Sequence, residues 1–597
     1  MSLCRVCRIL DTPAPEPLPA GEEIAEPGTA FCSDVCQAAW GARPGSFNGD
    51  RRWIEVRLPA DKPRRVLSQT PIGCLFEGGS NLLPALARVN NDLVDLYAPI
   101  KAPATISWVS RNTGPGQQAL MRTLLFMVLR ANAGLGTDRV LRLQHTLSQQ
   151  YYLEFIDTRP VEVRQLRRLE EAMQALQAAD LPVVVHDLPG PEAIELLERE
   201  GHLDSVAALS HRVPDAVRVH CLDGHWSWFL GPLLPRTRMA GPFRLEVHPP
   251  GFILRFPVFP DLDHIPPVAD QSRLFGVFHE YRRWTTATRA PDLASLNDRI
   301  VEGEGSDLIK LQEALHEKRI AAVADQIATQ RLARVVLVAG PSSAGKTTFT
   351  KRLALHLRIN GLSLCRIELD NYFRTGDDGP RDEDGQLDFE HLHAIDVAFF
   401  NEQLLALISG QSIRLPRFHF QSRSRQFEPD ATELRPDQIL LLEGIHGLND
   451  DLTPTVPSSM KFRIYVSALT HVNLDDHNRI STHDCRLLRR MLRDARERGY
   501  GATDTLRRWP SVVLGEERWI FPFQERADVM FNSALVYEMS VMAPHLLPLL
   551  REVPRSASEF AHAAYLIRLL ELFVPLQAEE VPPTSLLREF IGGSSFR

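Results

Sequence analysis

Hydrophobic positions near the middle of the chain form a short unbroken run and then recur at helical spacing. The run at 334–339 is rich in β-branched valine and leads into a glycine-rich turn at 340–345. Beyond the turn, residues 349–358 repeat apolar positions at intervals that suit one face of a helix. That face is formed by Phe349, Leu353, Leu355 and Leu357. The pattern therefore predicts a strand, a tight turn and a helix in direct succession.

The same pattern predicts strands and helices on both sides of this segment. Apolar residues alternate at 53–58, with Ile54, Val56 and Leu58 on one face, as in a strand with one buried side. Apolar runs and alternating apolar positions predict four more strands in the second half, at 362–369, 438–443, 461–466 and 528–533. Helical spacing predicts helices at 271–284 and 308–330. The fold class expected for the second half is α/β, with a parallel, doubly wound sheet.

The glycine-rich turn has the G-x-x-x-x-G-K-T spacing of a phosphate-binding loop. Its two glycines let backbone N–H groups converge on an anion at the start of a helix. Lys346 can reach the β- and γ-phosphates, and the Thr347 hydroxyl can ligate Mg²⁺. The residues expected to bind ATP are Gly340, Pro341, Ser342, Ser343, Ala344, Gly345, Lys346, Thr347 and Thr348. The pattern predicts a nucleoside triphosphate site and leaves open whether ATP or GTP is the donor.

Two of the predicted strands end on or next to a carboxylate. Asp370 follows the strand at 362–369, and Glu443 closes the strand at 438–443. In an open parallel sheet the carboxyl ends of the strands face the ligand, so both acids should lie beside the phosphates. Asp370 could accept a hydroxyl proton, and Glu443 could position Mg²⁺. Capping of a following helix is the structural alternative for each acid.

A stripe of arginines follows in the last third of the chain. Its members are spaced at i, i+3, i+4 and i+7, so a helix would place them on one face. They are Arg486, Arg489, Arg490 and Arg493. A solvated charged face is the common interpretation of such a run. With the acids expected elsewhere, we interpret the stripe as a lid whose guanidinium groups contact the transferred phosphate.

Length and composition limit the remaining possibilities. A chain of 597 residues is too long for one core and suggests about four domains. The contents of 44% hydrophobic and 24% charged residues are ordinary for a soluble globular protein. A net charge of -8 provides no general attraction to nucleic acid or to an anionic membrane. Neither a membrane span nor a signal peptide is recognisable, so we expect a cytoplasmic protein.

Four of the eight cysteines lie within the first 36 residues. They form two pairs with short spacings, Cys4 with Cys7 and Cys32 with Cys36. In a reducing compartment, such pairs favour a tetrahedral Zn²⁺ site over disulfides. Four free thiols in a loose tail are the alternative. The F-C-S-x-x-C motif at 31–36, followed by Trp40, resembles treble-clef zinc fingers with an FCS signature, which implies a structural metal.

The second half resembles the uridine kinase branch of the uridine kinase/phosphoribulokinase family over about 330–550. The likeness rests on the phosphate loop and on L-D-N-Y-F at 369–373, D-F-E-H at 388–391, E-G-I at 443–445 and R-L-L-R-R-M-L-R-D at 486–494. It implies a kinase with Asp370 as the base for a sugar hydroxyl. It further implies nucleoside contacts from Tyr372, Glu390 and Phe418. Arg423 stands where the family has a base-reading histidine, so the preferred base stays open.

The front half resembles two modules of threonyl-tRNA synthetases. Residues 51–110 are similar to the TGS domain, a small β-grasp module, and residues 115–258 to the second additional domain, which carries the editing site. The four ligand-type positions of that editing site fall here on Arg122, Phe126, Phe229 and Leu233. These side chains cannot form a zinc or acid–base site, so the resemblance implies a fold without editing chemistry.

These observations together predict six segments. They are a zinc-binding segment at 1–44, a TGS-like β-grasp domain at 45–114, an α+β editing-like domain at 115–258, a helical connector at 259–330, a kinase domain at 331–553 and a helical segment at 554–597. The leading hypothesis is ATP-dependent phosphorylation of a uridine- or cytidine-like nucleoside at its 5′-hydroxyl. A phosphoribulokinase-like enzyme for another small alcohol and an RNA- or tRNA-associated NTP-dependent sensor are the alternatives. Whether the chain forms a homo-oligomer is left open.

Overall fold

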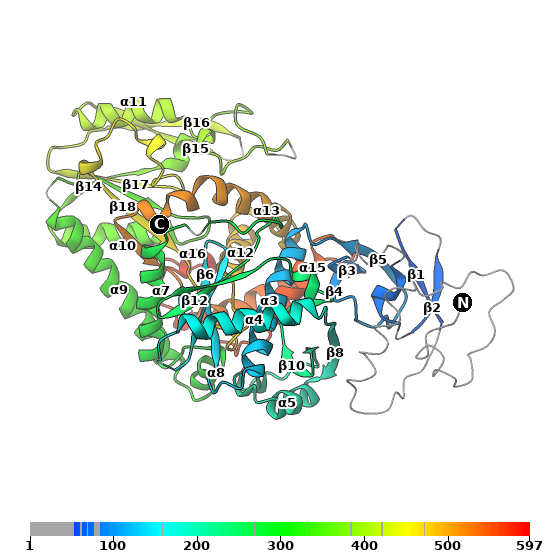
Figure 1. Cartoon of the computed structure of the whole chain (residues 1–597). Helices are drawn as coiled ribbons and strands as arrows, with labels where there is room; N and C mark the ends of the chain where they lie inside the picture. The colour runs from blue at the N-terminus through cyan, green and yellow to red at the C-terminus, as the bar shows by residue number, and fades with distance from the viewer. Residues whose placement is uncertain are drawn as a thin grey trace, which may run out of the picture. The chain divides into compact units, whose positions relative to one another are not determined.

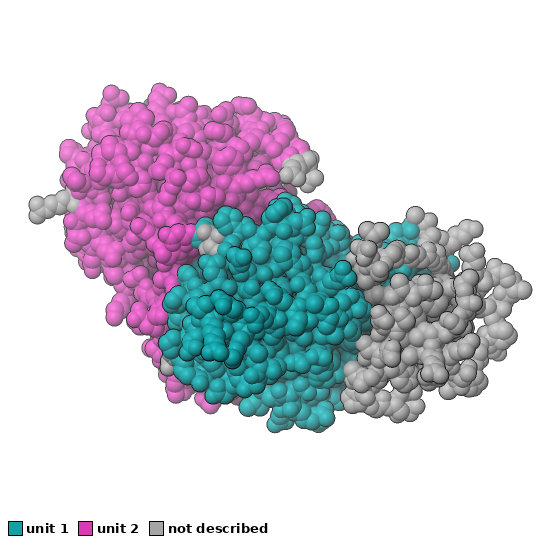
Figure 2. Space-filling model, viewed as in Figure 1, with its two compact units in different colours: residues 1–269, 473–479, 553–572 teal, residues 270–472, 480–552, 573–597 magenta. Residues whose placement is uncertain are grey.

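The computed structural model describes residues 53–59, 63–68, 70–76, 84–157, 159–267, 269–330, 332–382, 385–419, 422–470 and 472–596. The chain divides into two compact units, which Figure 2 colours separately. Unit 1 comprises residues 1–269, 473–479 and 553–572. Unit 2 comprises residues 270–472, 480–552 and 573–597. Two short pieces of the second half of the chain therefore belong to the same unit as the first half.

Unit 1 begins with a five-stranded sheet in the order β2-β1-β5-β3-β4. Its strands are β1 Trp53–Arg57, β2 Arg64–Leu67, β3 Leu86–Val89, β4 Asp92–Val94 and β5 Ala104–Val109. Strands β1 and β5 run parallel, and the other neighbours run antiparallel. Ile54 and Val56 are buried in the core beneath this sheet, with Leu58 packed against them. The alternation in the sequence therefore identified the buried face of β1 correctly.

The rest of unit 1 is built on two further antiparallel sheets, ordered β10-β9-β8 and β11-β12-β7-β6. The strands are β6 Leu141–Leu147, β7 Gln150–Phe155, β8 Val183–Pro189, β9 Ala216–Leu222, β10 His225–Trp228, β11 Arg244–His248 and β12 Gly251–Arg255. The helices are α3 Gly114–Gly134, α4 Val163–Ala178, α5 Gly190–Arg199, α6 Leu203–Ser210 and α15 Phe560–Leu570. Short 3₁₀ turns lie at Ile72–Leu75 and Thr237–Ala240. Helix α3 contributes many of the buried side chains of this core.

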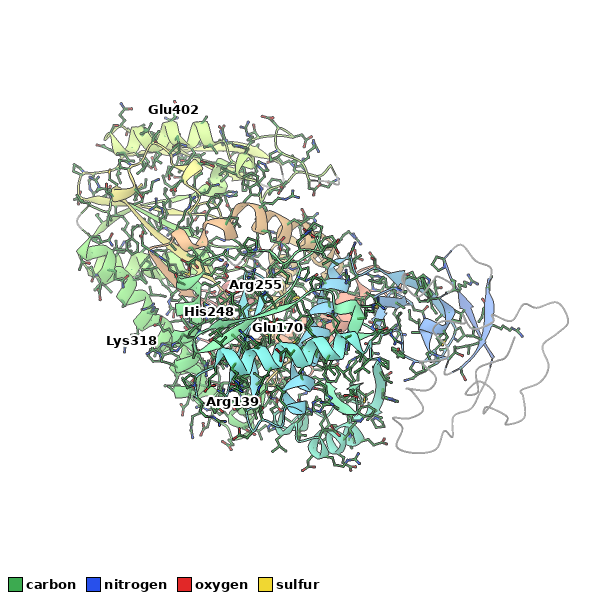
Figure 3. All side chains as sticks on the ribbon, in the orientation of Figure 1. Arg139, Glu170, His248, Arg255, Lys318 and Glu402 are labelled. Atoms are coloured by element: carbon green, nitrogen blue, oxygen red, sulfur yellow. The ribbon has the colours of Figure 1, made fainter. Side chains whose placement is uncertain are left out.

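Polar side chains connect the helices of unit 1 to the strands. Glu170 on α4 accepts a hydrogen bond from the backbone N–H of Leu245 on β11 at 2.7 Å, and Figure 3 labels this carboxylate. Arg139, also labelled there, stacks over the ring of Phe155 and pairs with Asp157. These contacts tie loop ends to the sheet β11-β12-β7-β6.

Unit 2 contains a five-stranded parallel sheet in the order β14-β17-β13-β18-β19. Its strands are β13 Val335–Ala339, β14 Ser363–Glu368, β17 Gln438–Glu443, β18 Lys461–Ser467 and β19 Val529–Asn532. All five were predicted within a residue or two of these bounds. The central strand β13 is buried along its whole length, which is why its sequence is a continuous apolar run.

Helices cover the sheet of unit 2. They are α7 Ser272–Ala287, α8 Leu293–Val301, α9 Gly305–Thr329, α10 Lys346–Ile359, α11 Val397–Ile408, α12 Thr482–Arg493, α13 Ala502–Trp519, α14 Glu538–Arg551 and α16 Arg588–Ile591. A π turn at Asp494–Arg498 extends α12. Short 3₁₀ turns lie at Leu369–Tyr372, Leu392–Ala394, Asp450–Leu452, Ser458–Met460, Phe521–Arg526 and Ala578–Glu580. A two-stranded hairpin, β15 Ile413–His419 and β16 Ser424–Thr432, was not predicted.

Helices α9 and α10 share one core with the sheet, and Figure 1 shows them in neighbouring positions. Phe349, Leu353 and Leu357 of α10 are buried there as the periodicity predicts. Leu355 is 47% exposed, so placing it on the buried face was wrong: a residue two positions from Leu353 points to the opposite side of a helix. A second core, on which α11 packs, contains Leu369, Phe400 and Phe418. The helix at 271–284 contributes Leu274, Phe278 and other side chains to a third core.

No helix among the described residues is long and apolar enough to cross a membrane.

Candidate active site

The phosphate loop joins the carboxyl end of β13 to the start of α10. Gly340 is required by space, because a Cβ atom there would lie 1.9 Å from the carbonyl oxygen of Val466 on the neighbouring strand β18. Gly345 has a φ of 82°, a left-handed conformation that favours glycine, and α10 begins at the next residue. The sequence thus folds locally into the strand, loop and helix that bind phosphate in other proteins.

Lys346 and Thr347 lie on the first turn of α10. The Lys346 ammonium group is buried and donates a hydrogen bond to the carbonyl of Pro341 at 3.0 Å. The Thr347 hydroxyl donates to Oε2 of Glu443 at 3.3 Å. Thr347 and Glu443 offer hard oxygen donors of the kind that Mg²⁺ prefers, so the residues present fit that ion.

Asp370 and Glu443 lie at the ends of the adjacent strands β14 and β17. Glu368 of β14 pairs in register with Glu443, and Asp370 follows two residues later. Burial raises the pKa of Glu443 to about 7, against the opposing effect of the Lys346 ammonium. Solvent reaches Asp370, but the protein around it desolvates the carboxyl and raises its pKa as well, again opposed by Lys346. Both acids are therefore close to the lysine, as sequence reasoning expected.

The four arginines of the stripe lie on α12, but each has a carboxylate partner on another element or turn. Arg486 pairs with Glu516, Arg489 with Glu538, Arg490 with Asp494 and Arg493 with Glu589. The expectation that acids lie away from the stripe was therefore wrong. Asp494 follows Arg490 by one helical turn, but Glu516, Glu538 and Glu589 lie in other helices, and the pattern of α12 cannot reveal them.

The arginines differ in what they offer to a phosphate. Arg490 donates to the Ser342 hydroxyl at 3.1 Å, and Arg493 donates to the Ser343 hydroxyl at 3.4 Å, so both reach the loop directly. Arg489 is fully buried and donates to the side chain and carbonyl of Ser533. Because the Ser533 hydroxyl in turn donates to the Ala344 carbonyl, Arg489 supports the loop from behind.

Two acids beside the loop were missed by sequence reasoning. Glu516 on α13 is fully buried, accepts a hydrogen bond from the Ser342 N–H at 2.9 Å and forms a two-point ion pair with Arg486. Glu589 on α16 accepts hydrogen bonds from the backbone and hydroxyl of Thr348, at 3.2 and 2.9 Å. Neither acid follows a recognisable motif, and both come from helices that reach the loop only through the tertiary fold.

Glu390, expected to bind a nucleoside, lies within electrostatic range of Glu516 and Arg490. Burial, and next the charge of Glu516, raise the pKa of Glu390 to about 7, while Arg490 and Lys346 oppose the rise. Its Oε2 atom is buried and has no hydrogen-bond partner among the residues that the structure describes. An unsatisfied carboxylate oxygen in such a place is suited to accept a hydrogen bond from a substrate hydroxyl.

The other residues expected to contact a nucleoside lie in different environments. Tyr372 is buried among Phe399 and Phe400, and its hydroxyl donates to Gln403 at 2.8 Å, so it supports the core. Phe418 and Arg423 line one small pocket with Phe389, Gly376 and others. The guanidinium of Arg423 pairs with Asp377. Of the three, Arg423 is exposed, whereas Tyr372 and Phe418 are buried.

Of the four positions that the resemblance assigned to an editing site, three hold buried apolar side chains. The rings of Phe126 and Phe229 pack at 5.2 Å, and Leu233 is buried beside them. Arg122 donates to the carbonyl of Pro232 at 3.2 Å and to Gln118 at 3.3 Å. The zinc ligands expected in the sequence, Cys4, Cys7, Cys32 and Cys36, lie outside the described residues.

Comparison with known proteins places the site within one family. Residues 335–540 match the phosphoribulokinase / uridine kinase family. The chain is 30% identical over 194 residues to a uridine kinase of Halobacterium salinarum, which covers 32% of this chain and 77% of that protein. It is 28% identical over 197 residues to a uridine kinase of Ligilactobacillus salivarius, and this match covers 33% of the present chain and 83% of that protein. A solved structure titled as a possible uridine kinase from Bacillus stearothermophilus is 18% identical, covers 36% of this chain and 98% of its own, and has a TM-score of 0.25.

Proposed function

The chain belongs to the phosphoribulokinase/uridine kinase family, and from that premise we propose that it transfers the γ-phosphoryl group of ATP to the 5′-hydroxyl of a nucleoside. The observation that carries the proposal is the arrangement of Lys346 with three carboxylates. Asp370, Glu390 and Glu443 all lie within electrostatic range of its ammonium group. One cation of the phosphate loop is thus next to a candidate base, a candidate hydroxyl acceptor and a candidate metal ligand.

On the donor side, the loop N–H groups and Lys346 bind and orient the phosphates. Arg490 and Arg493, which already contact the Ser342 and Ser343 hydroxyls, are placed to neutralise charge on the transferred group. Thr347 and Glu443 would hold Mg²⁺, which when bound neutralises phosphate charge and orients the β- and γ-phosphates. Arg486 and Arg489 keep their buried carboxylate partners and hold the loop in shape.

On the acceptor side, Asp370 accepts the proton of the 5′-hydroxyl. A bond forms between the 5′-oxygen and the γ-phosphorus, the bond from that phosphorus to the β–γ bridging oxygen breaks, and ADP is the leaving group. A pKa raised by the crowded surroundings makes Asp370 a better proton acceptor than an ordinary aspartate. Glu390 would accept hydrogen bonds from the ribose hydroxyls, Phe418 would stack on the base, and Arg423 would contact the edge of the base. Tyr372 keeps these groups in place from within the core.

A screen of acceptors tests this proposal directly. Purified full-length protein is incubated with ATP, Mg²⁺ and one acceptor at a time, and ADP release is measured together with ³¹P NMR of the product. We expect phosphorylation of uridine or cytidine at the 5′ position. Turnover with ribulose 5-phosphate or another small alcohol, and none with any nucleoside, would refute the proposed substrate class while leaving the kinase fold intact.

The role of Asp370 is tested by Asp370→Asn. We expect ATP binding to persist while turnover falls by roughly 10²–10⁴-fold, the usual effect of removing a general base. Asp437→Asn is the matched control, because Asp437 is an exposed carboxylate on the turn before β17. Near-normal turnover in Asp370→Asn would exclude Asp370 as the base. Lys346→Ala should instead weaken ATP binding and turnover together.

For the front of the chain we propose binding modules without hydrolytic activity. The mixed five-stranded sheet of β1 to β5 supports a TGS-like β-grasp domain, and the aromatic core at Phe126 and Phe229 supports an editing-like fold that lacks its chemistry. We propose further that Cys4, Cys7, Cys32 and Cys36 hold a structural Zn²⁺. Equilibrium binding of labelled tRNA and of single-stranded RNA to the full-length chain, at two salt concentrations, checks whether these modules have a nucleic-acid ligand.

A further inference from the structure

Residues 473–479 lie between β18 and α12 in the sequence but form a buried turn of unit 1. The turn is closed by a bridge between Asn473 and Arg479. The side-chain amide of Asn473 donates to the carbonyl of Leu143 on β6 at 2.6 Å, and that of Asn478 donates to the carbonyl of Trp228 on β10 at 2.9 Å. This segment, called the inserted turn below, is therefore attached to two sheets of unit 1.

The inserted turn brings two ligand-type side chains to a third. Asp475 and His477 of the turn are buried, and Asp204 stands half-buried at the start of α6. One oxygen or nitrogen atom from each of the three lies within 4.8 Å of the others. About 270 residues separate Asp204 from its two neighbours in the sequence, so the cluster exists only in the folded chain.

The hydrogen bonds of His477 define which ring nitrogen is available. Its Nε2 atom lies 2.8 Å from the carbonyl oxygen of Trp228, and because a carbonyl can only accept, Nε2 must carry the hydrogen. In a neutral ring, Nδ1 then has a lone pair, and it lies 3.5 Å from Oδ1 of Asp475. Oδ1 of Asp475 also accepts hydrogen bonds from the backbone N–H groups of His477, at 2.9 Å, and of Asn478, which hold it beside the ring. A cation between Nδ1 and this carboxylate would be a proton or a metal ion. A histidine whose other nitrogen donates to a backbone carbonyl is the usual form of a metal ligand.

The two carboxylates are also held in place by other groups. Oδ2 of Asp475 accepts hydrogen bonds from Ser205 at 2.8 Å and from Asn478 at 2.9 Å. Oδ2 of Asp204 accepts one from the backbone N–H of Asp476 at 2.7 Å. These partners orient the carboxylates in the way that outer-shell hydrogen bonds orient metal ligands.

The balance of charge points in the same direction. Three carboxylates meet here, those of Asp204, Asp475 and Asp476, and Arg142 pairs with Asp476. Arg142 offsets one of these three charges. The remaining negative charge is balanced by a proton on His477 or by a divalent cation bound in its place.

We propose that Asp204, Asp475 and His477 bind one divalent transition-metal ion and thereby fasten the inserted turn to unit 1. One imidazole with two carboxylates suits Mn²⁺, Co²⁺ or Zn²⁺, because Mg²⁺ and Ca²⁺ prefer oxygen ligands alone. The proposal is independent of the kinase reaction and of the zinc site proposed for the N-terminal cysteines.

Binding of Mn²⁺ to the full-length protein tests the proposal. The chelator-treated chain is titrated with MnCl₂ in the absence of nucleotide, and free Mn²⁺ is counted by electron paramagnetic resonance. We expect the wild-type chain to bind one ion more per chain than Asp204→Asn, or to bind that ion at least about tenfold more tightly. Comparing the two chains cancels any Mn²⁺ held at the kinase site or at the cysteines. His477→Ala should behave like Asp204→Asn.

Matched controls separate the metal site from general effects. Asp215→Asn changes an exposed acid of unit 1 and His545→Ala an exposed histidine of α14, and both should bind Mn²⁺ like the wild type. If His477→Ala does not fold, Asp204→Asn alone decides, because Asp204 is half-buried and the change keeps its shape. Equal numbers of ions with equal affinity in the wild type and in folded Asp204→Asn would overturn the proposal and leave a protonated His477 as the cation facing Asp475.

Discussion

Replacing Glu516 by glutamine removes the charge that holds Arg486 beside the phosphate loop. Both side chains are fully inaccessible to solvent, and Glu516 also accepts the N–H of Ser342 in the loop. Removing one partner of a buried, hydrogen-bonded ion pair costs about 3–5 kcal/mol, because the remaining charge stays buried without compensation. A domain has only about 5–15 kcal/mol of stability in total, so Glu516→Gln should lower the melting temperature of unit 2 by many degrees.

Binding of ATP should compensate for part of this loss. In Glu516→Gln the guanidinium of Arg486 lacks its anion but stays next to Ser342, to whose carbonyl it donates at 3.1 Å. Phosphate oxygens bound at the loop would offer a new anionic partner. Saturating ATP should therefore raise the melting temperature of the variant more than that of the wild type. Because Arg486 is buried and salt screens mainly exposed charges, this difference in melting temperature should persist at high salt.

Differential scanning calorimetry of the full-length chain, with and without MgATP, measures both effects. Glu517→Gln is the matched control, since Glu517 is the exposed neighbour on the same helix. The double variant Arg486→Met with Glu516→Leu should recover much of the stability, because replacing both partners of a buried pair by apolar residues is often neutral. A Glu516→Gln melting curve equal to that of the wild type, or an equal shift with ATP in both, would refute the reasoning.

Three further predictions concern the rest of the chain. Burial raises the pKa of Glu390 from about 4.5 to about 7, so between these pH values the folded protein keeps a proton that the unfolded protein loses, and the free energy of unfolding should fall as the pH rises. Glu390→Gln should remove up to about 2 kcal/mol of that fall, measured from melting temperatures between pH 5 and pH 8. Elemental analysis should find about one zinc fewer in Cys32→Ser than in the wild type, with unchanged kinase turnover; equal zinc contents would exclude the four-cysteine site. The 597-residue chain should not hydrolyse seryl-tRNA of threonine specificity, because Arg122, Phe126, Phe229 and Leu233 supply neither a zinc ligand nor a proton-transfer group. Serine release above the buffer rate would contradict this.

Much of the kinase half could be predicted from the sequence because its determinants are local. Continuous apolar runs identified buried strands such as β13, and alternating apolar positions identified the edge strand β14, whose side chains are alternately buried and exposed. The spacing of glycines and lysine in 340–347 identified the phosphate loop, and the ends of two strands placed Asp370 and Glu443 beside it. In each of these examples the informative pattern lies within about ten consecutive residues.

The predictions that failed depended on distant partners. The arginines of α12 were expected to lack acids, but the fold brings Glu516, Glu538 and Glu589 to them from other helices. Tyr372 follows the motif that suggested a nucleoside contact, yet its ring is enclosed by α11. Periodicity reports which face of a helix is buried, but it does not report what covers that face.

The sequence by itself therefore determined the positions of the strands, the phosphate loop and the acids at the strand ends. Short-range patterns of burial and backbone conformation specify these features. Only the tertiary structure decided which acids neutralise the arginines and which residues meet Asp204. Residues 473–479 show why: their neighbours in space are β6, β10 and α6, more than 240 residues earlier in the chain. Contacts over such separations arise from the packing of whole sheets and helices, and no local pattern encodes them.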